Sequence, residues 1–462
     1  MPAVPAALPA DLVGADRAQL DLTSYRTVFR DPRLLGLLDR ALANNQNLRA
    51  TVANVEAARQ LFRVQRAAQL PTVGVSGGVT VRDGSQGNRV GTNTNSAGGT
   101  GTGTTAVGGT SAQSTNLSLD FGVSAFELDL FGRLRSLSNA AFAQYLASEA
   151  GARSARIALV ASVADAWFTY ASDATLLQIA RDTRATAARS VALTNARLQG
   201  GVAPRTDLLQ AQTVLSTAEA DLANLTAQVR QDRDALDLLV GQPVADIDLP
   251  ANAEVFDTAL AVPPASLDSA VLLSRPDVEQ AEFLLQAANA RIGAARAALF
   301  PRITLTGLLG FASTALTRLF SGGSFSYSAG PGVSLPIFDG GAGRANLAAT
   351  RAQREATVAT YQNAIQTAFR DVSDALARRA TVGDQVAATQ RLTDAARDTQ
   401  TLVEARYRGG IDTFLQVLDA QRTFYTARRQ LTTVRLTRAL NGVALYRALG
   451  SDPLLNLPAT SR

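Results

Sequence analysis

The chain has 462 residues, a net charge of +5 at pH 7, and neither cysteine nor histidine. The absence of thiols excludes disulfide bonds, thiolate metal sites and cysteine nucleophiles, and the absence of imidazoles removes the commonest metal ligand and general base. All basic residues are arginines, and they are interspersed with Asp and Glu, which disfavours a nucleic-acid partner. No run of about 18 apolar residues is present, so the sequence predicts no transmembrane helix.

Residues 1–32 are rich in Pro and Ala and predict an extended N-terminal arm. The arm contains no basic segment followed by an apolar one, which indicates either a cytoplasmic chain or a chain whose signal peptide has been removed. From Asp31 to Gln69 the sequence becomes rich in Ala, Leu, Arg and Gln. This composition predicts a helix that ends at Leu70 and Pro71.

Two segments after this helix alternate apolar and polar residues, which is typical of strands with unlike faces. The apolar positions of the first segment are Val73, Val75, Val79 and Val81. Those of the second segment are Leu117, Leu119, Phe121 and Val123. Residues 83–116 are mostly Gly, Thr, Ser and Asn, so we expect a long mobile loop between two antiparallel strands.

A proline-free segment from 133 to 199 predicts a single helix about 100 Å long, at about 1.5 Å per residue. Its apolar residues recur at alternating spacings of three and four, which is typical of coiled-coil packing. They are Val160, Val163, Trp167, Tyr170, Ala174 and Leu177. Such a helix cannot lie inside a compact domain. Gly200 and Gly201 then predict a tight reversal, because glycine tolerates a positive φ, and Pro204 suits the start of a returning helix that ends at Val240.

The same order of elements returns in the second half of the chain. We expect a helix at 266–299, a strand that carries Ile303, Leu305, Leu309 and Phe311, a strand at 325–337, and a long helix at 344–408. A shift of 209 positions without a gap superimposes 196–241 on 405–450. The sequence therefore indicates an internal duplication, with a first repeat at 33–250, a second at 251–450 and a short C-terminal tail at 451–462.

The four strands have the length and the two unlike faces that are typical of membrane β-barrel strands. They fall in segments at about 71–126 and 301–338. A half-buried sheet of a soluble protein is the alternative. Four strands cannot close a barrel, since the smallest barrels need about eight, and an open sheet edge cannot remain in hydrocarbon. If the strands lie in a membrane, the chain must oligomerise, and the long helices would extend the barrel into a helical tube.

The sequence resembles the TolC-like outer-membrane efflux proteins, more closely the branch that works with resistance-nodulation-cell-division pumps. The resemblance extends over about 33–450. It is carried by SRPDVEQAEFLLQAANARIGAARAALFPRITLTG (274–307), FELDLFGRLR (126–135), LPIFDGGAGRANL (335–347) and ARYRGGIDTFLQVLDAQR (405–422). It implies an α+β membrane protein: a trimeric 12-stranded β-barrel, with four strands per chain, continuous with a long periplasmic α-helical coiled-coil barrel.

The resemblance further implies a function and partners. The chain would be the outer-membrane exit channel of a tripartite efflux pump in a Gram-negative bacterium, and would conduct drugs or other small molecules passively. Its partners would be two further copies of the chain, a periplasmic adaptor, an inner-membrane pump and outer-membrane lipid, with no catalytic residue, cofactor or metal. Many members of this branch carry a lipid-bearing N-terminal cysteine, and its absence here indicates a mature form or an unacylated member.

The resemblance also implies roles for residues near the two bends. Leu415 and Asp419 match side chains that ring the closed periplasmic mouth, and Arg422 matches their basic partner. Asp207 and Tyr407 match positions that tether neighbouring tip helices in the closed state.

The bends themselves are exposed ends of long helices, so we expect them to dock the adaptor. The residues concerned are Arg197, Gly200, Gly201, Val202, Arg406, Gly409, Gly410 and Ile411. Asp412 stands where some members have a basic residue, which predicts a partial tether network.

Other functions remain open. Glu127 and Asp129 share one face of an extended segment and would form a carboxylate pair, but nothing nearby completes a catalytic site. A soluble coiled-coil scaffold is a second alternative. It would be extracted without detergent, whereas a membrane barrel needs detergent. Within the family, heavy-metal efflux and type I protein secretion are the alternatives, and a chain with one Met and no His or Cys is poorly suited to a metal relay.

Overall fold

The computed structural model describes residues 24–84, 112–261, 275–450, 452 and 455. These residues fall into two compact units. One unit comprises Met1–Arg59, Phe142–Ala287 and Arg354–Arg462, and the other comprises Gln60–Ala141 and Ala288–Gln353.

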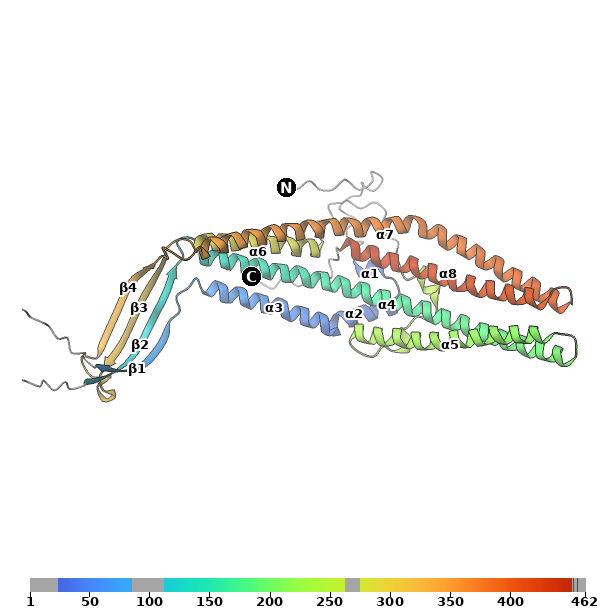
Figure 1. The fold of residues 1–462 in the computed structure, drawn as a ribbon, viewed down its shortest axis with the longest axis horizontal. Coiled ribbons are helices and arrows are strands. Elements are labelled where there is room, and N and C mark those ends of the chain that lie inside the picture. The colour runs from blue at the N-terminus through green and yellow to red at the C-terminus, as the bar shows by residue number, and fades with distance from the viewer. Residues whose placement is uncertain (1–23, 85–111, 262–274, 451, 453–454, 456–462) are drawn as a thin grey trace, which may run out of the picture. The chain divides into compact units, whose positions relative to one another are not determined.

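The second unit contains an antiparallel sheet of four strands in the order β1-β2-β3-β4 (Figure 1). The strands are β1 (Gly74–Gly84), β2 (Ala112–Leu128), β3 (Arg302–Ser313) and β4 (Phe325–Ser334). The register aligns residues of one kind across the sheet. One row consists of Val75, Phe121, Leu309 and Tyr327, and the next of Ser76, Asp120, Gly310 and Ser326. Because successive side chains point to opposite faces, one face of the sheet is apolar and the other is small or polar.

A β-bulge in β2 preserves these two faces. Val123 pairs with Gly307 and Phe126 pairs with Leu305, so two residues of β2 oppose Thr306 alone. The extra residue moves the apolar positions from odd to even numbers, and Phe126 therefore stays on the face of Val123. Strands β2 and β3 lie close together beside the bulge. A Cβ on Gly122, whose φ is +150°, would lie 2.1 Å from the carbonyl oxygen of Gly307.

The predicted loop at 83–116 is wrong at both of its ends. Residues 83–84 belong to β1 and pair with residues 112–113 of β2, and residues 114–116 of β2 pair with residues 80–82 of β1. Strand pairing uses backbone hydrogen bonds, so the polar composition of these ends did not exclude it. The remainder of the predicted mobile loop, 85–111, lies outside the described residues.

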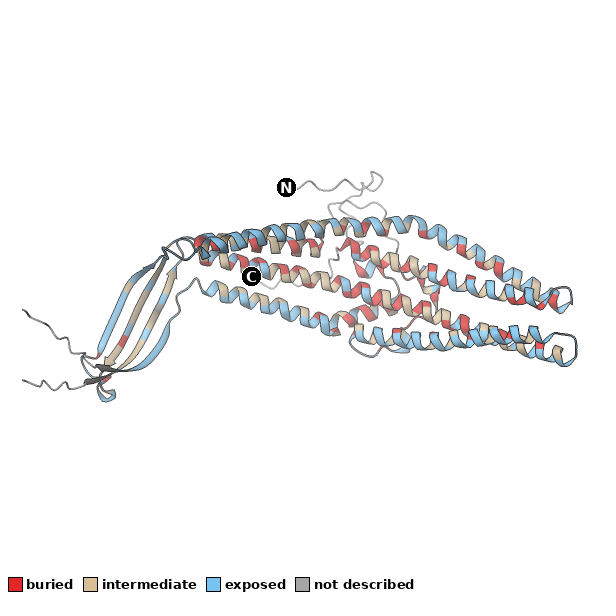
Figure 2. Ribbon diagram, viewed as in Figure 1, coloured by how far each residue is buried: buried red, intermediate tan, exposed pale blue. Residues whose placement is uncertain are grey.

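The first unit is helical, and its longest elements are two hairpins. The helices α4 (Arg133–Gln199) and α5 (Arg205–Val240) form one hairpin, and α7 (Ala342–Arg408) and α8 (Phe414–Leu449) form the other. Buried residues recur along each helix between exposed ones (Figure 2). On α4 the predicted seam residues Val160, Val163 and Trp167 are fully buried. None of the helices in the described ranges combines the length and apolarity that crossing a membrane requires.

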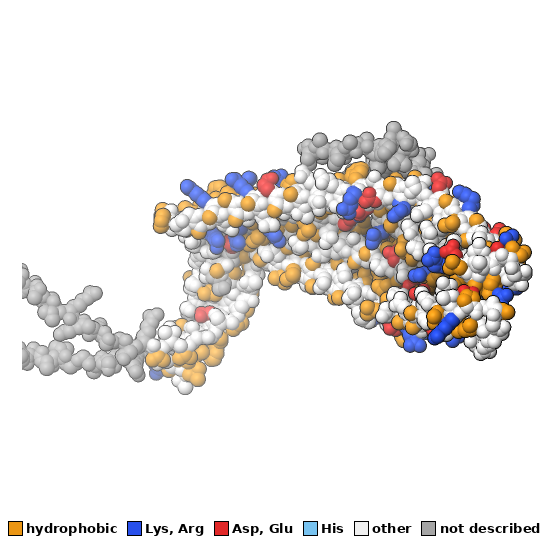
Figure 3. Space-filling model, turned by 45° about the vertical axis from the view of Figure 1, so that its right-hand side comes forward, with side chains coloured by type: hydrophobic (Ala, Val, Ile, Leu, Met, Phe, Trp, Pro, Cys, Tyr) orange, Lys and Arg blue, Asp and Glu red, His pale blue; other side chains and the backbone are white. Residues whose placement is uncertain are grey.

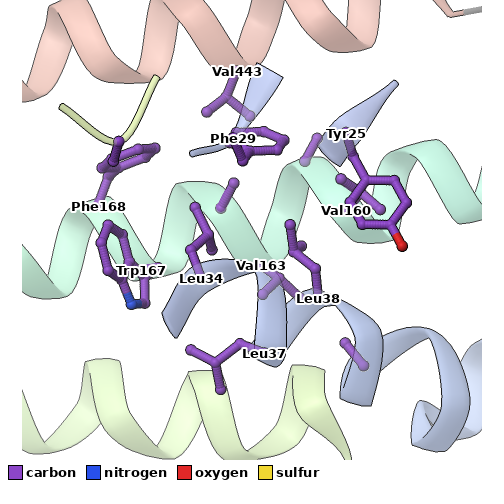
Figure 4. Close-up of a cluster of buried hydrophobic side chains, with 14 of the residues drawn as sticks. Tyr25, Phe29, Leu34, Leu37, Leu38, Val160, Val163, Trp167, Phe168 and Val443 are labelled. Carbon is purple, nitrogen blue, oxygen red and sulfur yellow. The ribbon is translucent and has the colours of Figure 1, made fainter. Parts of the chain in front are cut away.

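The main core of this unit joins α4 to the N-terminal segment (Figure 4). Residues 24–32 differ from the predicted extended arm, because α1 (Tyr25–Val28) forms a helical turn and Phe29 is fully buried. The segment is held by distant residues. Phe29 pairs with Leu260 in an isolated β-bridge, and the backbone N–H of Tyr25 donates to Asp452 Oδ2 at 2.8 Å. Residues 1–23 lie outside the described residues.

The predicted helix at 31–69 is two helices, α2 (Pro32–Asn44) and α3 (Gln46–Ala67). Asn45 separates them: its Oδ1 accepts from Leu48 N at 2.9 Å, and its Nδ2 donates to the carbonyl oxygen of Leu239 at 2.8 Å. An asparagine that satisfies a helix N-terminus in this way favours a break in the chain. Of the helix predicted at 266–299, residues 266–274 lie outside the described residues, and α6 spans Pro276–Ala297 and begins at a proline.

Candidate functional site at the helical tips

Both hairpins turn through the same backbone motif. In the first turn, Val202 N donates to Arg197 O at 2.9 Å and Gly201 N donates to Leu198 O at 3.0 Å. This pair of bonds is the Schellman pattern, which needs a left-handed residue just after the helix. Gly201 supplies it with a φ of +72°. The positive φ falls on the second glycine of the pair only, whereas Gly200, which follows the last residue of α4, has no positive φ.

The second turn repeats this geometry. Ile411 N donates to Arg406 O and Gly410 N donates to Tyr407 O, both at 3.0 Å, and Gly410 has a φ of +76°. A Cβ on Gly201 or Gly410 would meet no atom within 4 Å. Both turns therefore present open space around a glycine, beside the exposed side chains of Val202 and Ile411.

An ion pair closes the second turn. Arg406 Nε donates to Asp412 Oδ2 at 2.8 Å and Arg406 Nη2 donates to Asp412 Oδ1 at 3.0 Å. This bidentate contact holds the pKa of Asp412 below its ordinary value. Asp412 thus binds a basic residue of its own turn.

The predicted gate residues lie on one face of α8. Leu415, Asp419 and Arg422 are spaced by four and three residues, which places them on neighbouring helical turns. Arg422 Nη2 donates to Asp419 Oδ1 at 2.8 Å, and all three side chains are exposed. They line a cavity of about 510 Å³ between the two hairpins. The structure therefore brings the predicted acidic gate residue and its predicted basic partner together within one chain.

The two predicted tether residues, Asp207 and Tyr407, both lie in the described ranges but are not hydrogen-bonded to each other as Asp419 and Arg422 are. Among the contacts of the described residues there is no hydrogen bond between the Tyr407 hydroxyl and the Asp207 carboxylate. Tyr407 is instead buried in an apolar cluster that links the hairpins, and the Arg197 guanidinium lies 4.7 Å from the centroid of its ring. The other buried members are Ala211, Phe414, Val417 and Leu418. Asp207 lies in the first turn of α5, where its charge favours the helix N-terminus.

A second link between the hairpins was not found from the sequence. The Tyr425 hydroxyl on α8 donates to Asp221 Oδ2 on α5 at 2.5 Å, and Arg429 Nη1 lies 3.7 Å from the same oxygen. We call Tyr425, Asp221 and Arg429 the α5–α8 clamp. Beside it, Arg428 Nη2 donates to Asp182 Oδ2 on α4 at 3.3 Å. Burial and the hydrogen bond to Asp221 raise the pKa of Tyr425 to about 12, so its hydroxyl remains a donor at neutral pH.

The internal duplication carried a signal for this clamp. The shift of 209 positions superimposes Ser216 on Tyr425 and Glu219 on Arg428. The two copies thus differ in polarity or charge where one hairpin meets the other. On the face that Figure 3 shows, acidic and basic side chains are interspersed over the helices, as the sequence indicated.

The carboxylate pair considered for catalysis has other partners. Glu127 forms a bidentate ion pair with Arg133, at 2.6 and 2.8 Å. Asp129 Oδ2 accepts from Arg135 N at 2.7 Å, near the start of α4. Both carboxylates therefore fix the passage from strand to helix. Within the described ranges, the structure has no cluster of three or more acidic residues that could hold a metal ion.

Comparison with known proteins places the chain in a family. The family model described as outer membrane efflux protein matches residues 37–242 and 267–451, once in each half of the chain. The solvent efflux pump outer membrane protein SrpC of Pseudomonas putida is 42% identical over 93% of this chain and 87% of its own length. The outer membrane protein OprJ of Pseudomonas aeruginosa is 38% identical over 96% of this chain and 91% of its own length.

Solved structures agree with this assignment. The open state of the Neisseria gonorrhoeae MtrE outer membrane channel superimposes with a TM-score of 0.82 and 32% identity, over 97% of this chain and 96% of that one. The fold and the similarity to known channels define a channel protein of the outer membrane. The chain belongs to the outer membrane efflux protein family. It is an outer-membrane protein that extends into the periplasm, and it is not an enzyme. The predicted fold class is confirmed: a trimeric channel with an internal duplication.

Proposed function

We propose that this chain is the exit channel of a tripartite efflux pump, and that it conducts drugs, solvents or other small molecules passively once an adaptor and an inner-membrane pump open it. The similarity to SrpC over nearly the whole chain supports the substrate class. The arrangement of Leu415, Asp419 and Arg422 beside the cavity between the hairpins supports a gate at the tips.

In a trimer this arrangement places three copies of Asp419 around one axis. Three carboxylates at close range would repel one another, but each has an arginine at 2.8 Å in its own chain. The net charge of the ring therefore depends on both residues. An exposed ion pair of this kind contributes only about 0.2–1 kcal/mol, so partner binding can shift the balance between closed and open states.

The gate can be tested by single-channel recording in planar bilayers. Asp419→Ala should raise the conductance and lower the preference for cations, whereas Arg422→Ala should raise the preference for cations because it leaves the carboxylate uncompensated. Asp384→Ala is a matched control, since Asp384 is an exposed acidic residue of α7 away from the gate. If Asp419→Ala and Arg422→Ala both conduct and select like the parent, the gate lies elsewhere.

The two turns are the proposed docking surface for the adaptor. Gly201 and Gly410 have open space around them, so a bulky side chain there would obstruct a partner without a steric clash inside the chain, and its cost to the chain itself is the strain of the positive φ. We expect Gly410→Trp to abolish efflux and to leave the trimer yield unchanged. Gly410→Asn is the matched control, because asparagine tolerates a positive φ and adds little bulk. Normal drug resistance in the Gly410→Trp strain would exclude docking at this turn.

A further inference from the structure

Two carboxyl groups meet inside the seam between α4 and α5. Asp173 precedes Leu177 on α4 by four residues, and Asp232 follows Leu225 on the antiparallel helix α5 by seven. Because Leu177 and Leu225 share one buried cluster, the two carboxyl groups lie at the same level of the seam. The neighbouring positions of the same seam are apolar, with Leu177 and Leu225 buried and Val229 packed against them. Only 9% of Asp232 is exposed, and its Oδ2 is buried without a hydrogen-bond partner among the described residues. A buried acceptor in this state is costly unless a proton is supplied.

The charged groups around the pair do not neutralise it. On α5, Gln228 Nε2 donates to Asp232 Oδ1 at 3.2 Å, but this donor is neutral. The adjacent Arg233 binds Asp246 at 2.7 Å and donates to the carbonyl oxygen of Val244 at 3.0 Å.

The remaining charged and titratable groups belong to α2, α4 and α8. On α2, which packs against α5, Arg40 binds Asp248 at 2.6 Å. Tyr170 lies one turn before Asp173, and burial raises its pKa. On α8, which packs against α5, Arg435 donates to Gln390 and Arg438 binds Asp257. No ion pair joins an arginine to Asp173 or Asp232 in the described part of the chain. The two carboxyl groups therefore face each other without a cation.

We propose that Asp173 and Asp232 share one proton across the α4–α5 seam, and that the loss of this proton loosens the packing of the two helices. The hairpin that carries the Gly201 turn then becomes sensitive to periplasmic pH. The device does not depend on the proposed gate, because the pair lies on the other hairpin and involves neither Leu415 nor Asp419. Two carboxyl groups in contact, with Asp232 buried and Asp173 half-buried, cannot both ionise without large repulsion.

The direction of the pH dependence follows from the two states of the seam. In the packed seam, burial first and the Asp232 charge second raise the pKa of Asp173 from 3.8 to about 7. In an opened, hydrated seam the pKa returns to its ordinary value. The packed seam therefore binds more protons between these two pKa values, and its stability falls as the pH rises through about 7. From pH 6 to pH 8 the equilibrium constant for opening should rise about tenfold.

Hydrogen exchange measures this opening in the intact trimer. The full chain in detergent is exchanged at pH 6 and pH 8, the rates are corrected for intrinsic exchange, and peptides that cover 225–236 are compared. We expect the protection of these peptides from exchange in the parent to fall about tenfold from pH 6 to pH 8. Asp173→Asn should remove the dependence, because the amide donates to Asp232 at any pH. Asp234→Asn is the matched control, since Asp234 is exposed on the same helix and should behave like the parent.

Either of two outcomes would contradict the proposal of a shared proton. One is equal protection of the parent at both pH values, and the other is the same tenfold loss of protection in Asp173→Asn. A second measurement needs no substitution at the pair. The infrared carbonyl band of a protonated carboxyl group should be present at pH 7 in the parent trimer and absent at pH 9. Asp165→Asn identifies the contribution of a further acid of α4, whose pKa burial raises to about 6. Absence of the band at pH 7 would contradict the proposal.

Discussion

Removing the hydroxyl of Tyr425 should make the channel open more readily. Tyr425→Phe keeps the ring and deletes only the hydrogen bond to Asp221, so the α7–α8 hairpin loses one link to the α4–α5 hairpin. Leu415 and Asp419 belong to the same helix as Tyr425. Any motion that carries them away from the channel axis relative to α5 must therefore break the α5–α8 clamp.

The magnitude follows from burial. A hydrogen bond to a charged group stabilises by about 1.5–3 kcal/mol when it is buried. The Asp221 side chain is 30% exposed, so water replaces part of the lost bond, and we take the lower value of about 1.5 kcal/mol. That corresponds to about a tenfold shift of the opening equilibrium for each chain. If the three chains of a trimer open together, the shifts multiply to about a thousandfold.

Single-channel recording distinguishes this effect from a general loss of a tyrosine hydroxyl. Tyr145→Phe is the matched control, because Tyr145 also donates to a carboxylate, that of Glu149, but within a single helix. We expect a higher open probability for Tyr425→Phe than for the parent. Tyr145→Phe should have the open probability of the parent. Asp221→Asn should resemble Tyr425→Phe. The reasoning is refuted if the open probability of Tyr425→Phe equals that of the parent while the trimer remains intact.

Three further changes test the structure. Phe29→Ala should lower the stability of the helical unit by about 3–5 kcal/mol, measured by thermal unfolding, because this fully buried ring lies in the main core. Gly122→Ala should reduce the yield of detergent-stable trimer on gels, since its Cβ would collide with the Gly307 carbonyl oxygen, and a normal yield would contradict the strand pairing. Asp412→Asn should raise exchange at the second turn by removing the charge that Arg406 binds, and unchanged exchange would assign that ion pair no role.

Much of the fold could be predicted because its determinants are local. The spacing of Val160, Val163 and Trp167 indicated a seam along one helix, and those residues are fully buried. Helix ends at glycine pairs were also predictable, since the Schellman turn is decided by Gly201 and Gly410 themselves. The alternation of apolar residues in the strands likewise follows from the period of an extended chain.

The candidate site was predicted only in part. The family resemblance identified Leu415, Asp419 and Arg422. The spacing of Asp419 and Arg422 on one helix made their contact predictable from the sequence. Periodicity could not show that Tyr407 lies beneath Arg197 or that Tyr425 binds Asp221, because the partners belong to different hairpins. The duplication pointed to the second contact only through the difference between its two copies.

By itself, the sequence determined the order of the elements, the duplication and the need for partner chains. The order follows from periodicities that span a few residues, and the need for partners follows from the unpaired edges of a four-stranded sheet. Tertiary structure alone decided the burial of Phe29 and the meeting of Asp173 with Asp232. Each of these depends on a residue far away in the chain: the backbone of Leu260 and the facing helix α5. The break at Asn45 combines a local cap on Leu48 with a distant partner, the carbonyl of Leu239. Local pattern cannot specify such pairings, because their free energy arises only when the distant segments are packed together.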